Sequence, residues 1–391
     1  MTSHVKQEAL RLAIKGMFIG DSVAMPVHWY YNVLDIKRDF NGWISKYERP
    51  LSDHPSSILR KSNKGGSGRH ASDKDHPPPV IGNVILHGKL DAWSENASTS
   101  HYHQGMAAGQ NTLNCHCALQ VMRTLSSRGF DSDTDLIKQV LHDYVVFMTT
   151  PNSHNDTYAE SWHRAFFADW VVANKPTDRD VLFEFAKRRS DRMLKQSPDK
   201  QLEAVGLFVV PLPIILYNIH RPLDHVVKIA KEFVRITHPV NLIDEHLVRY
   251  ITVLHSVVRG ASLRDEAEKA LKECLGPTAV HMINAFDAKI EKSTDVLSTF
   301  QRVTDQIGIA CYIEGAMTNI YHICRHYYDD FESGILMNVN IGGENCHRGS
   351  ALGALLGASA GALGKSIPKK WTEALDFNDK IDQLFNQNLK K

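Results

Sequence analysis

The residues best equipped for chemistry gather near the end of the chain, where two glycines form a tight turn. An acid, an amide, a thiol, an imidazole and a guanidinium follow directly: Glu344, Asn345, Cys346, His347 and Arg348. Small residues come next, with glycines at 349, 353, 357 and 361, a spacing that lines one face of a helix and lets a neighbouring backbone approach closely. First-turn N–H groups of a helix attract anions and ligand oxygens, so polar groups at this start indicate a site. The alternative is a glycine turn before a tightly packed core helix.

Three other segments place side-chain oxygens at the end or start of a predicted helix. Asp21 follows a glycine at a helix end, Thr112 and Asn114 open a second helix, and Asn155 and Asp156 precede a third. In a helical bundle these helix ends could converge on one pocket with the C-terminal turn. Asn155 and Asp156 could equally serve only as helix caps.

Two histidine spacings are compatible with metal binding. Glu160 and His163 have the i, i+3 spacing of helical-bundle metal sites, but a single copy favours a surface pair. His322 and His326 are spaced i, i+4, which can chelate a metal, although the neighbouring tyrosines favour packing or exposure.

The secondary structure that holds these residues is predicted to be helical throughout. Alternating strand patterns are essentially absent, and no repeat of fixed period is visible. The apolar stretch 204–219 contains two prolines and is predicted to be a buried, interrupted helix. The expected fold is all-α, a compact multi-helix bundle in a single domain over 1–391. Helices are expected at 5–24, 113–127, 133–149, 155–173, 180–194, 200–218, 222–237, 241–258, 263–274, 278–289, 307–328, 347–363 and 372–388.

A loop insertion at about 39–110, in the N-terminal half, interrupts this helical pattern. It is rich in Gly, Pro, Ser, Asn, Asp and His and has little periodicity. Such a long loop is typical of a functional lid or a disordered insert. Its second half carries residues suited to recognition, namely Trp93, His101, Tyr102 and His103.

Composition excludes several function classes. The 391 residues carry 45 basic and 44 acidic side chains, so nothing indicates binding to nucleic acid or an anionic membrane surface. The first residues lack the basic start and uninterrupted apolar core of a signal peptide. Six cysteines without an export signal are expected to be reduced thiols, so we expect a cytoplasmic protein. The sequence favours no particular oligomeric state.

Together, the segments resemble the signatures of the ADP-ribosylglycohydrolase family, which also includes certain eye-lens crystallins. The family is all-α. Its signatures are a helix ending in Gly-Asp-Ala-x-Gly-x-Pro with an acid shortly after, a Thr-Asp-Asp-Thr helix start, and Gly-Gly-Asp-x-Asp-Thr before a helix of small residues. In this chain, the segments that correspond to the three signatures are, in the same order, residues 16–26, 112–115 and 342–347. The resemblance spans nearly the whole chain and implies the family's all-α fold.

The metal ligands of the family are altered at most positions. In the family, aspartates and threonines of the second and third signatures hold two magnesium ions that position the ribose and a water. The corresponding residues here are Leu113 and Asn114, then Glu344, Cys346 and His347, with His28 in place of the acid after the first signature. Leucine cannot ligate, and a thiol is too soft for magnesium. We therefore expect no two-magnesium centre and no cofactor. If a metal such as magnesium binds, its ligands would be Asp21, Thr112, Asn114 and Glu344.

The replacing residues could themselves form an active site. We expect Glu344 to act as general base, with His28 or His347 as the proton partner and Asp21 orienting the substrate. Cys346 could be a nucleophile at a helix start or a packed thiol. Arg348 could neutralise a carboxylate or phosphate. The substrate-binding set is then Thr112, Asn114, Asn155, Asp156, Asn345, Cys346 and Arg348.

Three functions agree with this sequence. The first is an enzyme that hydrolyses or rearranges an N-glycosidic or amide-like C–N bond of a small molecule without two magnesium ions, with lyase, cyclase or isomerase chemistry open. The second is a true ADP-ribosylglycohydrolase with an atypical single-metal site. The third is a non-enzymatic binding or crystallin-like protein. Retained polar groups at the expected pocket favour the first.

Overall fold

The structure is a computed structural model that describes residues 5–61, 79–127, 129–196 and 200–388. Within these ranges the regular structure is helical, and the β-type pairing consists of isolated bridges such as Ala204 with Tyr312. The prediction of an all-α fold is confirmed. The buried apolar residues form a connected cluster that extends from Ala9 to Phe385.

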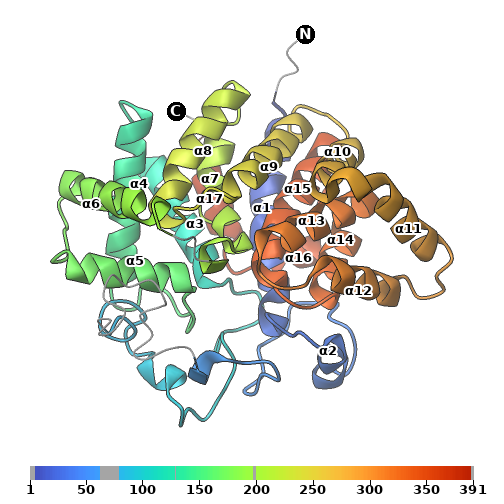
Figure 1. Cartoon of the computed structure of the whole chain (residues 1–391), viewed down its shortest axis with the longest axis horizontal. Helices are drawn as coiled ribbons and strands as arrows, with labels where there is room; N and C mark the ends of the chain where they lie inside the picture. The colour runs from blue at the N-terminus through green and yellow to red at the C-terminus, as the bar shows by residue number, and fades with distance from the viewer. Residues whose placement is uncertain (1–4, 62–78, 128, 197–199, 389–391) are drawn as a thin grey trace.

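The centre of the molecule is a pair of helices from opposite ends of the chain, α1 (Gln7–Ala24) and α15 (Asn345–Ala362) (Figure 1). Their glycines interlock: a Cβ added at Gly353 would overlap the carbonyl oxygen of Gly16, and one added at Gly349 would overlap the backbone of Gly20. This confirms the close helix pair that the glycine spacing predicts.

The other helices flank this pair on two sides (Figure 1). One side carries α3 (Leu113–Ser127), α4 (Asp133–Thr149), α5 (Ser161–Val172), α6 (Arg179–Leu194), α7 (Leu212–Asn218) and α8 (Leu223–Thr237). The other carries α10 (Leu263–Leu275), α11 (Ala279–Glu291), α12 (Val296–Ile307), α13 (Ile313–Tyr327) and α14 (Phe331–Asn340), with α9 (Ile243–Val257) between the two groups. Two C-terminal helices, α16 (Lys369–Glu373) and α17 (Asn378–Asn388), complete the bundle.

Most helix predictions are confirmed, and the failures are local. α3 and α4 have the predicted bounds. The helix expected at 155–173 begins only at Ser161, because residues 155–160 are extended and Asp156 caps α3 instead. The stretch 200–218 is broken into two 3-10 turns and α7, as its prolines predict. Sequence patterns missed α2 (Val33–Asp39), α12 and α14.

The expected loop insertion begins after a short helix, α2 (Val33–Asp39). Its described residues are irregular, with 3-10 turns at Leu59–Lys61 and Leu90–Trp93, while 62–78 lie outside the described residues. It runs beside the end of the bundle (Figure 1) and carries the buried His54, His101 and His103.

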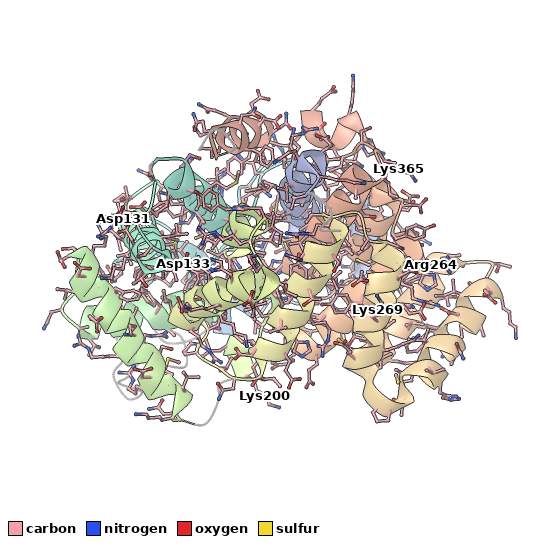
Figure 2. All side chains as sticks on the ribbon, turned by 90° about the horizontal axis from the view of Figure 1, so that it is seen from above. Asp131, Asp133, Lys200, Arg264, Lys269 and Lys365 are labelled. Atoms are coloured by element: carbon pink, nitrogen blue, oxygen red, sulfur yellow. The ribbon has the colours of Figure 1, made fainter. Side chains whose placement is uncertain are left out.

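The outer surface carries charges of both signs. Viewed from above (Figure 2), Asp131 and Asp133 lie on the α4 side and Arg264 and Lys365 on the opposite side. Among the described helices, none is both long and apolar enough to cross a membrane.

Candidate active site

Helix ends from distant parts of the chain meet beside the central pair. Asp21 lies in the last turns of α1, Thr112 directly precedes α3, and Glu344 is the N-cap of α15. Gly342 and Gly343 form the turn before Glu344 with φ of 72° and 67°, a conformation that favours glycine. The convergence that the sequence suggests is therefore present for these three segments.

The Asp21 carboxylate on α1 contacts residues at the starts of both α3 and α15. One carboxylate oxygen accepts hydrogen bonds from the Asn111 side chain and the Thr112 N–H, both at 2.8 Å, and the other accepts from the Thr112 hydroxyl at 2.7 Å. The Cys346 thiol lies 3.2 Å from that second oxygen and 3.1 Å from the Asp21 carbonyl. Both oxygens of this buried carboxylate already face protein donors, so Asp21 positions the site.

Glu344 is the centre of a group of buried ionisable side chains. Its Oε1 lies 2.9 Å from His28 Nε2, 3.1 Å from His347 Nδ1 and 3.2 Å from the His347 N–H. Its Oε2 is buried and has no hydrogen-bond partner among the described residues. We call Glu344, His28 and His347 the His–Glu cluster. The free oxygen is an acceptor that a water or substrate could use.

The three groups have clearly different protonation tendencies. Burial opposes ionisation of Glu344, but His28 and His347 outweigh it and hold the pKa of this carboxyl well below its ordinary value. Burial also opposes charge on His347, but Glu160 and Glu344 outweigh it and raise the pKa of His347 to about 10. For His28, burial outweighs the attraction of Glu344 and lowers its pKa to about 4. At neutral pH the cluster therefore contains a carboxylate, an imidazolium and a neutral imidazole.

The loop extends the cluster with a residue that sequence reasoning did not assign to the site. His103 Nε2 lies 2.8 Å from His28 Nδ1, and His103 Nδ1 lies 2.8 Å from Asp156 Oδ1. Asp156 also accepts from the Leu113 N–H at 2.7 Å, so it caps α3. Burial disfavours the charged form of Asp156, but His103 outweighs it and lowers the pKa to about 2. A hydrogen-bonded chain thus runs from Asp156 through His103 and His28 to Glu344.

Asn114 belongs to a second buried network. It donates to Glu160 Oε1 at 2.5 Å and accepts from His163 Nε2 at 3.0 Å, while Tyr144 donates to His163 Nδ1 at 2.7 Å. Glu160 Oε1 lies 3.7 Å from His347 Nδ1, so this network adjoins the His–Glu cluster. Sequence spacing paired Glu160 with His163 as a surface pair; both are buried, and Asn114 bridges them.

Several predicted substrate-binding residues have structural contacts instead. Arg348 is buried and donates to the Asn338 side chain and the Gly342 carbonyl. Asn345 donates to two backbone carbonyls, and Asn155 is exposed and donates to Gln110. Burial raises the pKa of the Cys346 thiol well above its ordinary value, which favours a packed thiol.

The residues do not fit a two-magnesium centre. Magnesium needs several oxygen ligands with free lone pairs. The Asp21 oxygens face N–H, O–H and S–H donors, the Asn114 oxygen faces a ring N–H, and Leu113 offers no ligand. Ligand atoms of His28, Glu344 and His347 do lie within 4.8 Å of one another. That nitrogen-rich set suits a transition metal better than magnesium.

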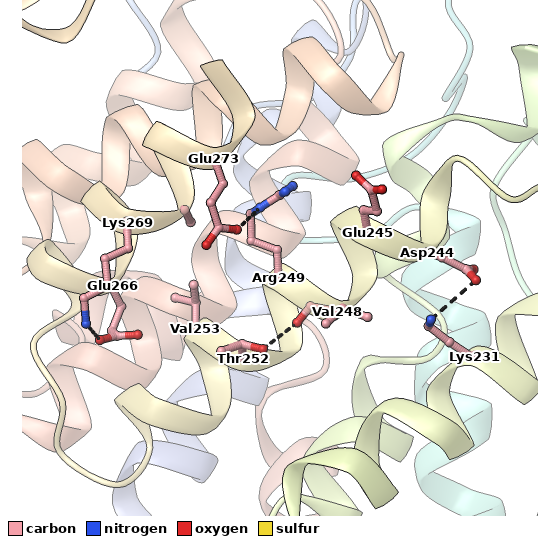
Figure 3. Close-up of a pocket in the computed structure, with 11 residues that line it drawn as sticks. Lys231, Asp244, Glu245, Val248, Arg249, Thr252, Val253, Glu266, Lys269 and Glu273 are labelled. Atoms are coloured by element: carbon pink, nitrogen blue, oxygen red, sulfur yellow. Dashed lines mark hydrogen bonds and ion pairs between the residues drawn. The ribbon is translucent and has the colours of Figure 1, made fainter. Parts of the chain in front are cut away.

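Two hollows open elsewhere on the surface. The groove in Figure 3 encloses about 450 Å³ along α8, α9 and α10, and its charges pair among themselves, for example Arg249 with Glu273 and Lys269 with Glu266. A second hollow of about 440 Å³ reaches His54, whose Nε2 bonds the His28 carbonyl at 2.7 Å. Neither hollow is lined by the His–Glu cluster, which is closed in this conformation.

Comparisons with known proteins cover the segments that form this site. A family model described as ADP-ribosylglycohydrolase matches residues 2–391. Among solved structures, an ADP-ribosylglycohydrolase-related protein complex is similar at 17% identity, with a TM-score of 0.48 and 98% of each chain covered. No curated protein matches the chain. The family match includes every segment that contributes to the site.

Proposed function

The chain belongs to the ADP-ribosylglycohydrolase family, a family of hydrolases, and we propose that it hydrolyses or rearranges an N-glycosidic or amide-like C–N bond of a small molecule without a two-magnesium centre. The observation that carries this proposal is the buried Glu344 carboxylate between two imidazoles, with one oxygen unpartnered. Buried groups with strongly shifted pKa values are typical of catalytic sites.

The proposed mechanism divides the proton chemistry between Glu344 and His347. The Glu344 carboxylate, held by His28 through its Oε1, takes a proton from the attacking water on its unpartnered Oε2 as the water oxygen bonds to carbon. Protonated His347 donates its proton to the nitrogen that leaves with the C–N bonding electrons. The Glu344 and Glu160 carboxylates favour the positive charge that develops on a glycosyl carbon in such a reaction.

Substrate entry requires a segment that covers Glu344 to move. The Glu344 N–H donates to the Ile309 carbonyl at 2.9 Å, so Ile309 lies against Glu344, and we propose that residues 308–312 are the segment that moves. This segment begins at Gly308, with φ of 117°, and ends at the half-exposed Tyr312. Partial exposure of Tyr312 and nearby Tyr31 makes this the side from which we expect a substrate to enter.

Substitution at Glu344 and His347 tests the proposed function. Purified protein in excess chelator would be incubated with a panel of N-glycosides and amides, and products would be measured by mass spectrometry. We expect Glu344→Gln and His347→Asn each to lower turnover at least ~100-fold, because each removes a proton-transfer partner. The matched control is Glu273→Gln, which removes an ion-paired carboxylate in the groove of Figure 3 and should leave turnover unchanged.

The alternatives give different results. Turnover of an ADP-ribose conjugate that requires added magnesium would identify a true ADP-ribosylglycohydrolase, an option that family membership supports. Wild-type turnover that persists unchanged in folded Glu344→Gln and His347→Asn would contradict the proposed mechanism.

A further inference from the structure

His322, on α13, is buried in a way that its protein neighbours do not explain. Its side chain is 1% exposed, and neither ring nitrogen has a hydrogen-bond partner among the described residues. A neutral imidazole always carries one N–H donor and one lone pair, and leaving a buried polar group unsatisfied costs about 1–3 kcal/mol. Such a group in a folded protein calls for a partner.

Two further potential ligands lie beside it. His326 is one helical turn further along α13, and Asp287 projects from α11. Ligand atoms of all three residues lie within 4.8 Å of one another, and His326 Nε2 is 3.3 Å from Asp287 Oδ1. The His322 and His326 rings stand at 82° with centroids 5.0 Å apart. Two imidazoles at i, i+4 and a carboxylate from a second helix therefore share one small volume.

The surroundings exclude water on one side and hold the carboxylate on the other. Phe286 packs against the His322 ring, and Phe300 of α12 packs against both histidine rings. Arg325 donates to both Asp287 oxygens, at 2.6 and 2.7 Å, which fixes the orientation of the carboxylate. Outer partners of this kind commonly orient metal ligands. Each Asp287 oxygen thus accepts one Arg325 donor and keeps a second lone pair for a metal, whereas each Asp21 oxygen already faces two donors.

We propose that Asp287, His322 and His326 bind one divalent transition-metal ion of the zinc class. Two neutral imidazoles and one carboxylate form a ligand set typical of zinc, with water completing the coordination. Magnesium and calcium prefer oxygen ligands and are disfavoured here. This metal site is separate from the His–Glu cluster and does not depend on the proposed function.

The protonation tendencies agree with this ligand role. Burial outweighs the attraction of Asp287 and lowers the pKa of His322 to about 3. Burial likewise lowers the pKa of His326. Bound metal would join α11 to α13 and satisfy the otherwise unpartnered His322 ring.

Zinc titration of the full-length protein tests the site. Chelator-stripped protein would be titrated with Zn²⁺, bound metal measured by elemental analysis, and the melting temperature recorded with and without zinc. We expect His322→Leu and His326→Gln each to remove one equivalent of bound zinc, or to weaken it at least ~100-fold, since loss of a direct ligand exceeds the effect of an outer partner. Metal bound elsewhere in the molecule would be retained in both variants.

The matched control is His225→Gln, which removes a histidine 3.4 Å from Asp133 outside the site and should keep the zinc equivalent. Without zinc, His322→Leu should melt no lower than the wild type, because it removes an unsatisfied buried group. If His322→Leu does not fold, zinc binding by His326→Gln tests the site by itself, because His326 is partly exposed and its replacement is less disruptive. No zinc bound by the wild type, or an equivalent retained in His326→Gln, would overturn the proposal.

Discussion

At Glu344, one carboxylate oxygen accepts hydrogen bonds from the His28 ring and the His347 N–H and forms an ion pair with the His347 ring, while the second oxygen stays unpartnered. The two histidines that contact this carboxylate differ in charge state because burial outweighs the attraction of Glu344 and lowers the pKa of His28, whereas for His347 burial is outweighed by Glu160 and Glu344, which together raise its pKa. One carboxylate thus holds an imidazolium and an imidazole side by side. In the proposed reaction the imidazolium of His347 is the proton donor and the unpartnered oxygen of Glu344 is the proton acceptor.

The raised pKa of His347 makes a prediction about stability and pH. Its pKa rises from about 6.5 in the unfolded chain to about 10 in the folded protein. The folded state therefore gains stability from this group below about pH 6.5 and loses it as pH rises towards 10. We expect the advantage of the wild type over His347→Gln in unfolding free energy to shrink by a few kcal/mol across this window.

Urea unfolding of both proteins at several pH values provides the measurement. The matched control is His246→Gln: burial lowers the pKa of His246 to about 4, so this ring is uncharged throughout the window and its replacement should show no such loss between pH 6.5 and 10. A constant difference between wild type and His347→Gln across the window would show that His347 is not protonated in the folded protein.

The identity of several site residues could be predicted from the sequence, but their partners could not. Asp21, Thr112, Glu344 and His347 stand at helix ends, and helix ends are visible in a sequence. The pairing of His103 with His28 joins residues 75 positions apart through an irregular loop, which periodicity does not describe. The sequence indicates Glu160 only through its spacing to His163, because its hydrogen-bond partner Asn114 lies on another helix.

Among the helices, α1 and α15 position most of the site, and their contact depends on glycine. Gly353 allows the α1 backbone to approach so closely that a methyl group would overlap the Gly16 carbonyl. We expect Gly353→Ala to destabilise the protein by at least ~2 kcal/mol, since both partners are backbone atoms that cannot move aside cheaply. Gly129→Ala, where an added methyl meets nothing within 4 Å, should change stability by less than ~0.5 kcal/mol.

Chemical denaturation of the two variants against the wild type measures this difference. Equal stability of Gly353→Ala and wild type would mean that the helices do not pack as closely as described. Such a result would also remove the basis for the fixed positions of Asp21 and Glu344, because these residues occupy the ends of the two helices.

Helix prediction succeeded where apolar spacing was long and regular, and failed where tertiary contacts set the boundary. α3 and α4 carry uninterrupted periodic patterns. α12 and α14 are short, and each begins at an aspartate N-cap, Asp295 and Asp330, whose capping hydrogen bonds appear only in the folded chain. The late start of α5 follows from Asp156, which bonds α3 instead of its own helix.

On the scale of the whole molecule, the chain has the all-α fold of its family, and we propose that its centre works by a different chemistry. The glycine-lined helix pair, the three signature segments and the helical flanks agree with membership of the ADP-ribosylglycohydrolase family. The oxygen ligands that magnesium needs are replaced or occupied by hydrogen-bond donors. A closed cluster of histidines and carboxylates occupies their place, which is the basis for a reaction without two magnesium ions.

Calorimetric titration of the chelator-stripped protein with magnesium, and then with ADP-ribose in its presence, tests whether the site holds magnesium. We predict no heat of magnesium binding, because Asp21 and Asn114 already use their oxygens within the protein. Stoichiometric magnesium binding that disappears in Asp21→Asn, accompanied by ADP-ribose binding, would contradict it.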